Sequence, residues 1–163
     1  MTKTLRNPLF LWGMLALTII CRLGFVVIHN ISDVTFIDML AKPGEVLAVV
    51  GAMTPSQKLV HILVSASLDM AFPMAYGGLM VGLVHRYFLR ATWILSVPAL
   101  LAIVFDVVEN LVQILILQGN FGLLSAKLWL TPAKFGFALI GVAIAITALG
   151  VGVLGRNMQR TRR

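Results

Sequence analysis

Residues 97–117 read VPALLAIVFDVVENLVQILIL, and this stretch decides the fold. It is apolar enough to cross a bilayer, yet four polar side chains interrupt it. These are Asp106, Glu109, Asn110 and Gln113. Spacings of three and four residues put them on one face of a helix. The stretch therefore predicts a membrane-spanning helix whose polar face must meet other polar groups inside a bundle.

The composition is that of an integral membrane protein. Of the 163 residues, 60% are hydrophobic and 12% are charged, and the mean hydropathy is +0.98. Soluble domains carry about 25% charged residues. A hydrocarbon core about 30 Å thick needs roughly 20 apolar residues per helix, so this length allows about four spans. We therefore expect no soluble catalytic domain.

The apolar runs predict a single all-α domain, a bundle of four transmembrane helices. The expected spans lie at about residues 8–28, 55–84, 92–117 and 126–154. The first run is longer than the roughly 7 to 15 apolar residues of a signal peptide, so we expect it to be retained.

Two further sequence features concern the second span and the connection that leads to it. Thr54 and Gln57 fit a capping box, which predicts the start of the second span, and Pro73 is expected to interrupt that span. The connection 29–54 is polar and is broken at Pro43. We expect it to lie on the outward surface of the membrane as short amphipathic pieces.

The basic residues indicate topology. The formal net charge is +7, but lysine and arginine gather at the ends of apolar runs, so we expect no nucleic-acid partner. One side of the membrane would hold Lys3, Arg6, Arg86, Arg90, Arg156, Arg160, Arg162 and Arg163, and the other Lys42, Lys58 and Lys127. By the positive-inside rule, both termini are expected in the cytoplasm, with the chain in a bacterial inner (plasma) membrane.

Five ionisable residues fall inside the expected spans: Arg22, Asp69, Asp106, Glu109 and Lys134. Each costs about 2.5 to 3.5 kcal/mol at the middle of a helix, so they should face one another. At about 1.5 Å per residue, the charges of the four spans lie roughly 3 to 9 Å from the bilayer centre, in its outward half. The sequence predicts either a pocket opening outward or a closed knot of ion pairs at that level.

The charge balance of this cluster suggests chemistry. Two cations face three carboxylates, and the surplus negative charge calls for a proton or a bound cation. We expect Asp106 and Glu109 to share a proton; in an enzyme they would be donor and acceptor, and Asp69 would orient or neutralise. Lys134 and Arg22 would hold an anionic headgroup or keep the carboxylates ionised. The candidate catalytic residues are Asp69, Asp106 and Glu109, and the candidate ligand-binding residues are Arg22, His61, Tyr76, Asn110, Gln113 and Lys134.

The sequence gives no support for a metal ion or another cofactor, and we expect neither. Cys21 is the single cysteine, so it has no partner for a disulfide or a paired thiolate site. His61 and Asp69 are eight residues apart, which is no recognised spacing of metal ligands.

The same residues carry a resemblance. Asp69-x3-Pro73-x2-Tyr76-Gly77, Phe105-Asp106-x2-Glu109-Asn110 and Lys134 resemble the pattern of small four-span bacterial membrane proteins without an assigned function. This implies the architecture and the site, but no reaction. A looser likeness is to the emopamil-binding and sigma-2-receptor superfamily, whose four-helix cores hold acidic residues in a lipid-accessible pocket for sterol-like or cationic amphiphilic ligands. The histidine-and-glutamate pattern of its sterol isomerases is not matched, so we expect no isomerase activity.

Three functions are compatible with these features. The first is binding, or acid/base processing, of a small amphipathic or lipid-like molecule that enters from the lipid or the periplasm. The second is a proton- or cation-coupled small transporter that forms a homo-oligomer through glycine faces such as Gly78 and Gly82. The third is a structural or accessory subunit, in which the charges only hold the helices together. Membrane lipid is an expected partner in each case.

Overall fold

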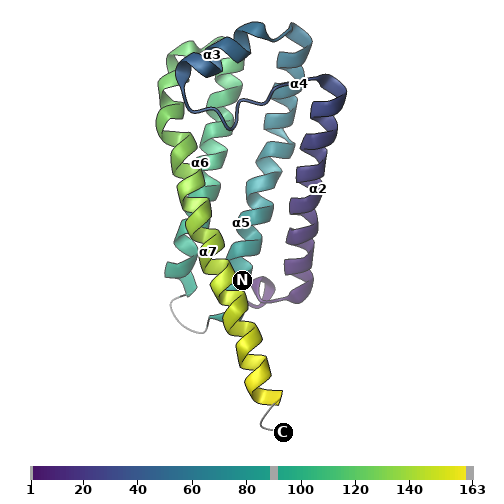
Figure 1. Cartoon of the computed structure of the whole chain (residues 1–163), viewed down its shortest axis with the longest axis vertical. Coiled ribbons are helices and arrows are strands. Elements are labelled where there is room, and N and C mark those ends of the chain that lie inside the picture. Colours follow the sequence, from purple (N-terminus) through teal and green to yellow (C-terminus); the bar gives the residue numbers. More distant parts are fainter. Residues whose placement is uncertain (1, 89–91, 161–163) are drawn as a thin grey trace.

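The computed structural model describes residues 2–88 and 92–160, and within them the fold is all-α (Figure 1). Four stretches are long and apolar enough to cross a membrane, which confirms the predicted four-helix bundle. The helices are α1 (Thr2–Leu5), α2 (Pro8–Ser32), α3 (Pro43–Ala52), α4 (Pro55–Ala66), α5 (Leu68–Tyr87), α6 (Thr92–Leu117), the 3-10 helix η1 (Phe121–Ala126) and α7 (Lys127–Arg160).

The long helices differ in how many neighbouring helices they contact. α6 contacts α4, α5, α7 and η1, and α5 contacts α7 as well. α2 packs mainly on α5, with a small contact to α1, so it lies at the edge of the bundle. Both ends of the chain lie at the same end of the bundle, opposite α3 (Figure 1).

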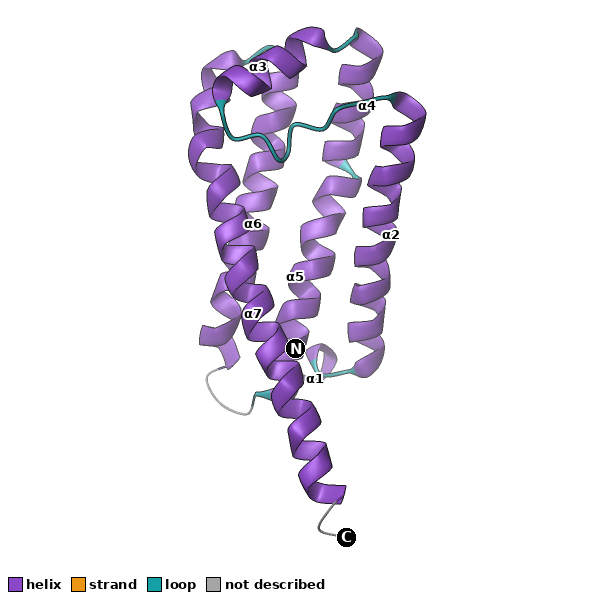
Figure 2. Ribbon diagram, in the orientation of Figure 1, coloured by secondary structure: helices purple, strands orange, loops and turns teal. Residues whose placement is uncertain are grey.

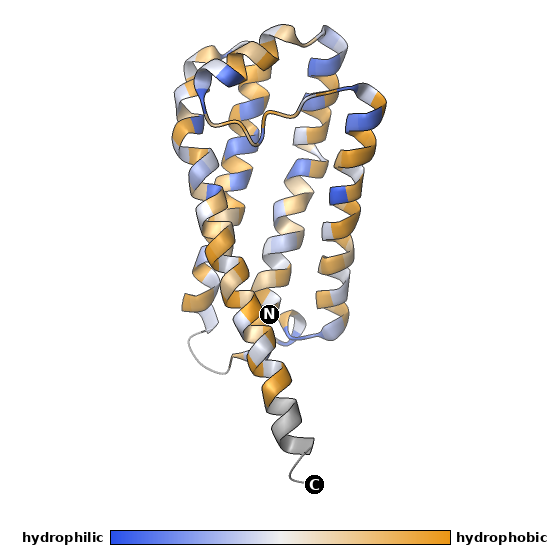
Figure 3. Ribbon diagram, viewed as in Figure 1, coloured by the Kyte–Doolittle hydropathy of each residue, from blue (hydrophilic) through white to orange (hydrophobic). Residues whose placement is uncertain are grey.

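The surface has the inverted polarity of a membrane protein. Large apolar side chains are exposed on every long helix, among them Trp12, Ile94 and Trp129. The buried set, in contrast, contains charged and amide side chains such as Glu109 and Lys127. Hydrophilic segments gather in the half of the bundle next to α3 (Figure 3). The pattern is that of a multi-pass membrane protein with a polar interior in one half.

The connection between the first two spans forms a cap at the end of the bundle. A loop of residues 33–42 crosses this end and leads into α3, which Pro43 begins and does not interrupt (Figure 2). The buried residues Ile37, Val46 and Val50 form an apolar core with the end of α6. The expected surface segment is thus a folded cap that covers the polar half of the bundle.

The second span is interrupted, but at a different residue from the one predicted. Thr54 forms the expected capping box, accepting from Gln57 N at 3.3 Å while the Gln57 side chain accepts from Thr54 N at 2.9 Å. The break between α4 and α5 lies at Ser67, whose backbone angles are φ −119° and ψ −79°. Pro73 lies inside α5. The predicted interruption at Pro73 is wrong, because a neighbouring helix satisfies the carbonyl that the proline leaves free.

The glycine motifs are used for contacts within the chain. A Cβ on Gly82 would lie 2.5 Å from Leu11 Cδ2 and 3.1 Å from the backbone oxygen of Leu5. A Cβ on Gly78 would lie 3.0 Å from Met14 Sδ. The Gly-x3-Gly motif therefore lets α5 approach α2 and α1 closely.

These contacts predict that Gly82→Val destabilises the protein by about 1 to 3 kcal/mol, because the added side chain must displace Leu11 and the α1 backbone. Gly13→Val is the matched control, since nothing lies within 4 Å of a Cβ at that position. Thermal unfolding of the two variants in detergent measures the difference. Equal melting temperatures would contradict the assignment of this motif to the α2–α5 contact.

Candidate functional site

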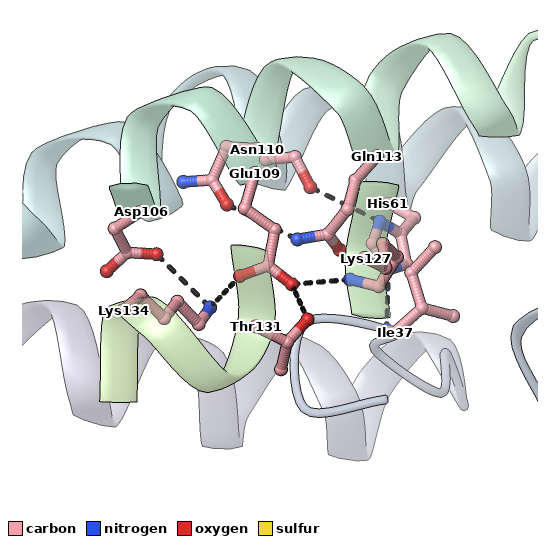
Figure 4. A network of polar contacts seen from close by, with 10 residues as sticks. Ile37, His61, Asp106, Glu109, Asn110, Gln113, Lys127, Thr131 and Lys134 are labelled. Atoms are coloured by element: carbon pink, nitrogen blue, oxygen red, sulfur yellow. Dashed lines mark hydrogen bonds and ion pairs between the residues drawn. The ribbon is translucent and has the colours of Figure 1, made fainter. Parts of the chain in front are cut away.

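Glu109 lies at the centre of a buried ion-pair network that joins α6 to α7 (Figure 4). Lys127 Nζ lies 2.6 Å from Glu109 Oε1, and Thr131 Oγ1 donates to the same oxygen at 2.5 Å. Lys134 Nζ lies 2.7 Å from Glu109 Oε2; this contact lacks hydrogen-bond geometry, but the short separation makes it an ion pair. Glu109 is 0% exposed, so one carboxylate contacts two ammonium groups away from water.

Lys134 extends the network to Asp106. Its ammonium lies 3.2 Å from Asp106 Oδ1, and Tyr76 OH donates to Asp106 Oδ2 at 2.9 Å, which adds α5 to the network. No hydrogen bond joins Asp106 directly to Glu109 among the described residues. The expectation that these two acids share a proton is therefore wrong for this structure, because the ammonium of Lys134 bridges them.

Pro73 and Asn110 form a second link between α5 and α6. Proline has no amide hydrogen to donate to the carbonyl four residues earlier, which here is that of Asp69. Asn110 Nδ2 donates to this carbonyl at 2.8 Å. Gln113 Nε2 in turn donates to Asn110 Oδ1 at 3.4 Å. The helix is thus continuous through Pro73, and its position beside the network is fixed by a hydrogen bond from α6.

His61 connects the network region to the cap. The backbone amide of Ile37 donates to His61 Nε2 at 3.1 Å, so that nitrogen is the acceptor and the proton of the neutral ring is on Nδ1. Nδ1 lies 3.3 Å from Ser65 Oγ. His61 is 1% exposed and holds the loop of the cap, and it makes no hydrogen bond to an acid within the described chain.

Arg22 does not join the other predicted residues. Its side chain is exposed on α2, and it forms no ion pair with any residue that the structure describes. The reason is the packing of α2, which turns one narrow face to α5 and leaves the rest of its surface outside the bundle. The expected inward position of Arg22 is a wrong prediction.

Lys127 and Thr131 belong to the network but are not among the candidate site residues predicted from the sequence. Lys127 was expected at the outward membrane surface, yet it is 0% exposed. Its spacing from Thr131 and Lys134, at i+4 and i+7, already placed the three on one polar face of the helix. Burial by the cap could not be read from this spacing, because residues 34–50 are distant in sequence.

Asp69 is the unbalanced member of the cluster. It is 6% exposed, and its carboxylate makes no hydrogen bond or ion pair with the described part of the chain. With Lys127 replacing Arg22, the network still has two ammonium groups against three carboxylates. Asp38 in the half-buried cap loop adds a further acid close enough to interact with Asp69 and Lys127. The cluster therefore has surplus negative charge, and Asp69 is where that charge lacks a partner.

Access differs between the two ends of the network. At the capped end, Glu109, Lys127 and Gln113 are all 0% exposed, so the expected outward mouth is closed. Elsewhere in the cluster, Asp69 and Lys134 keep a small exposed surface, and Tyr76 is half-buried. Two surface pockets, of about 460 and 160 Å³, are lined by residues outside the network.

Comparisons of the chain with protein-family models, with curated proteins and with solved structures found no match.

Removal of Lys127 is expected to be strongly destabilising. Lys127→Met leaves Glu109 with a single cation in a buried site, which should cost about 3 to 5 kcal/mol. Lys58→Met removes the same charge from a residue outside the network and is expected to change stability by less than about 0.5 kcal/mol. Denaturant unfolding in mixed micelles gives both values. A Lys127→Met protein as stable as wild type would show that the ion pair contributes nothing.

The link between Pro73 and Asn110 can be measured with a double-mutant cycle. Asn110→Ala is expected to cost about 1 kcal/mol in the parent protein, because the Asp69 carbonyl then lacks a donor. In a Pro73→Ala background the new backbone amide supplies that donor, so the cost should largely vanish. Pro98→Ala serves as the control background and should be additive with Asn110→Ala. Additivity in both backgrounds would refute the proposed pairing.

Proposed function

We propose that the protein binds a small amphipathic molecule with a cationic headgroup, and that Asp69 pairs with this headgroup. The observation that carries the proposal is the buried carboxylate of Asp69, which has no partner in the described structure while Asp106 and Glu109 do. A buried carboxylate is unfavourable unless it is protonated or paired. A ligand ammonium would supply the missing positive charge.

The surroundings of Asp69 favour a ligand with an apolar tail. Phe72 packs on Tyr76 with ring centroids 5.2 Å apart, and Phe25 of α2 packs on Phe72 at 6.0 Å. Aromatic faces attract cations, and their bulk is compatible with hydrocarbon. The tail would extend toward the lipid, since the cap closes the opposite end.

Entry of the ligand from the lipid requires a helix that can be displaced from the bundle, and α2 is the best candidate. It packs mainly on α5, whereas α5, α6 and α7 all contact one another. A small displacement of α2 would open the Phe25 side of Asp69 and leave the ion pairs of Glu109 intact. In this proposal the pairs with Lys127 and Lys134 fix the position of Asp106 and Tyr76 before the ligand binds.

A proton- or cation-coupled transporter is the second candidate, because a proton on Asp69 would also cancel the surplus charge. It predicts proton or cation flux in proteoliposomes that is lost in Asp69→Asn. In this proposal the chain lies in a bacterial inner membrane, and the positive-inside rule supports an orientation with both termini in the cytoplasm and the cap in the periplasm. The position of both chain ends opposite α3 is consistent with this orientation (Figure 1).

Binding can be tested by thermal stabilisation with three probes of equal chain length: dodecylamine, dodecanol and dodecanoate. The amine is expected to raise the melting temperature of the purified protein, and the alcohol and the acid are not. Asp69→Asn should weaken the response to the amine by at least about thirtyfold in concentration, since a buried charge pair is lost. The same substitution should stabilise the empty protein, because it removes an unpaired buried charge.

Asp33→Asn is the matched control for this experiment. Asp33 is exposed and has a positive φ of 50°, a conformation that asparagine also adopts readily. This variant should respond to dodecylamine as wild type does. Equal stabilisation by dodecylamine and dodecanol, or an unchanged response of Asp69→Asn to dodecylamine, would contradict the proposal.

A further inference from the structure

An apolar groove of about 460 Å³ lies at the end of the bundle opposite the cap. Leucines from three helices form it, Leu11 and Leu15 from α2, Leu79 and Leu83 from α5, and Leu149 from α7. α2 and α7 flank α5 here without packing closely on each other. The groove is therefore a lateral opening in the side of the bundle, bordered by Trp12, Arg86 and Tyr87.

Arg86 lines the groove and is hydrogen-bonded to Arg6, which lies just before α2. Arg86 Nη1 donates to the backbone oxygen of Arg6 at 2.5 Å, and Arg6 Nε donates to the backbone oxygen of His85 at 2.7 Å. These bonds link two segments that each carry an arginine, so an anion bound beside Arg86 would be favoured by both charges. Neither arginine forms an ion pair with a residue in the described ranges.

The acids of the chain lie elsewhere and cannot supply this counterion. Three of the six are in the cap region and its loop, and the other three are in the buried cluster around Glu109. Exposed Trp12 beside Arg86 is typical of the interface between hydrocarbon and headgroups. The groove thus joins an apolar surface to Arg86 and its neighbour Arg6, neither of which has an acidic partner in the described residues.

We propose that this groove is a binding site for an anionic phospholipid. One acyl chain lies along the leucines, and the phosphate is bound by Arg86 and Arg6, whose planar forks match phosphate oxygens. A zwitterionic lipid offers the same phosphate but adds a cationic group, which the two arginines repel. The site therefore prefers phosphatidylglycerol to phosphatidylcholine. It stands apart from the proposed function, because none of its residues belongs to the ion-pair network.

Native mass spectrometry of the full chain in detergent, with added phosphatidylglycerol or phosphatidylcholine, tests this site. Wild type is expected to retain phosphatidylglycerol at about fivefold lower lipid concentration, which is what one arginine near the surface contributes. Arg86→Gln should lose this preference, and Arg86→Lys should keep most of it. Lys58→Gln, the same charge change at the other end of the bundle, should leave it unchanged.

A second variant tests the site independently, in case Arg86→Gln loses its structure. Leu15→Trp fills the groove but keeps both arginines and their backbone hydrogen bonds. It should reduce retention of phosphatidylglycerol while the protein keeps its elution volume and melting temperature. Equal retention of the two lipids by wild type, an unchanged preference in Arg86→Gln, or unchanged retention of phosphatidylglycerol in Leu15→Trp would overturn the proposal.

Discussion

The ion pairs of Glu109 are the constraint on which the rest of the structure depends. One carboxylate without exposure to water holds two ammonium groups of α7, at 2.6 Å for Lys127 and 2.7 Å for Lys134. In hydrocarbon each of these groups is tolerable only beside a partner of opposite charge, because alone it would be a buried unpaired charge. The register of α6 against α7 is consequently fixed, and the polar contacts of α5 are built on that pair of helices.

The cap and the proline both serve this polar centre. The cap excludes water from Lys127 and Glu109, which strengthens their attraction by keeping the local dielectric low. Pro73 removes a hydrogen bond from α5 and gives the free carbonyl of Asp69 to Asn110. A local defect in one helix is thereby converted into a contact between two helices, close to the one acid that lacks a partner.

Much of this arrangement could be predicted from the sequence, and the failures have a common cause. Helical spacing identifies the polar face of α6 and of α7, because it depends only on the geometry of one helix. The outward direction of Arg22 and the burial of Lys127 depend on which helices pack together and on the cap. The break at Ser67 has a local contact instead, a hydrogen bond from Ser67 Oγ to the Leu63 carbonyl at 2.6 Å, whereas the usual sequence signal in this span is Pro73.

The peripheral position of α2 has a consequence for how freely its sequence can change. In its most apolar window, 6% of the residues are buried, against 39% in α6. Side chains that face lipid need hydrophobicity but no particular shape, whereas those in a packed interior need both. Leucine, isoleucine, valine and phenylalanine are therefore interchangeable over most of α2. Natural variants should accumulate there first, while the surface around Gly78 and Gly82 stays fixed.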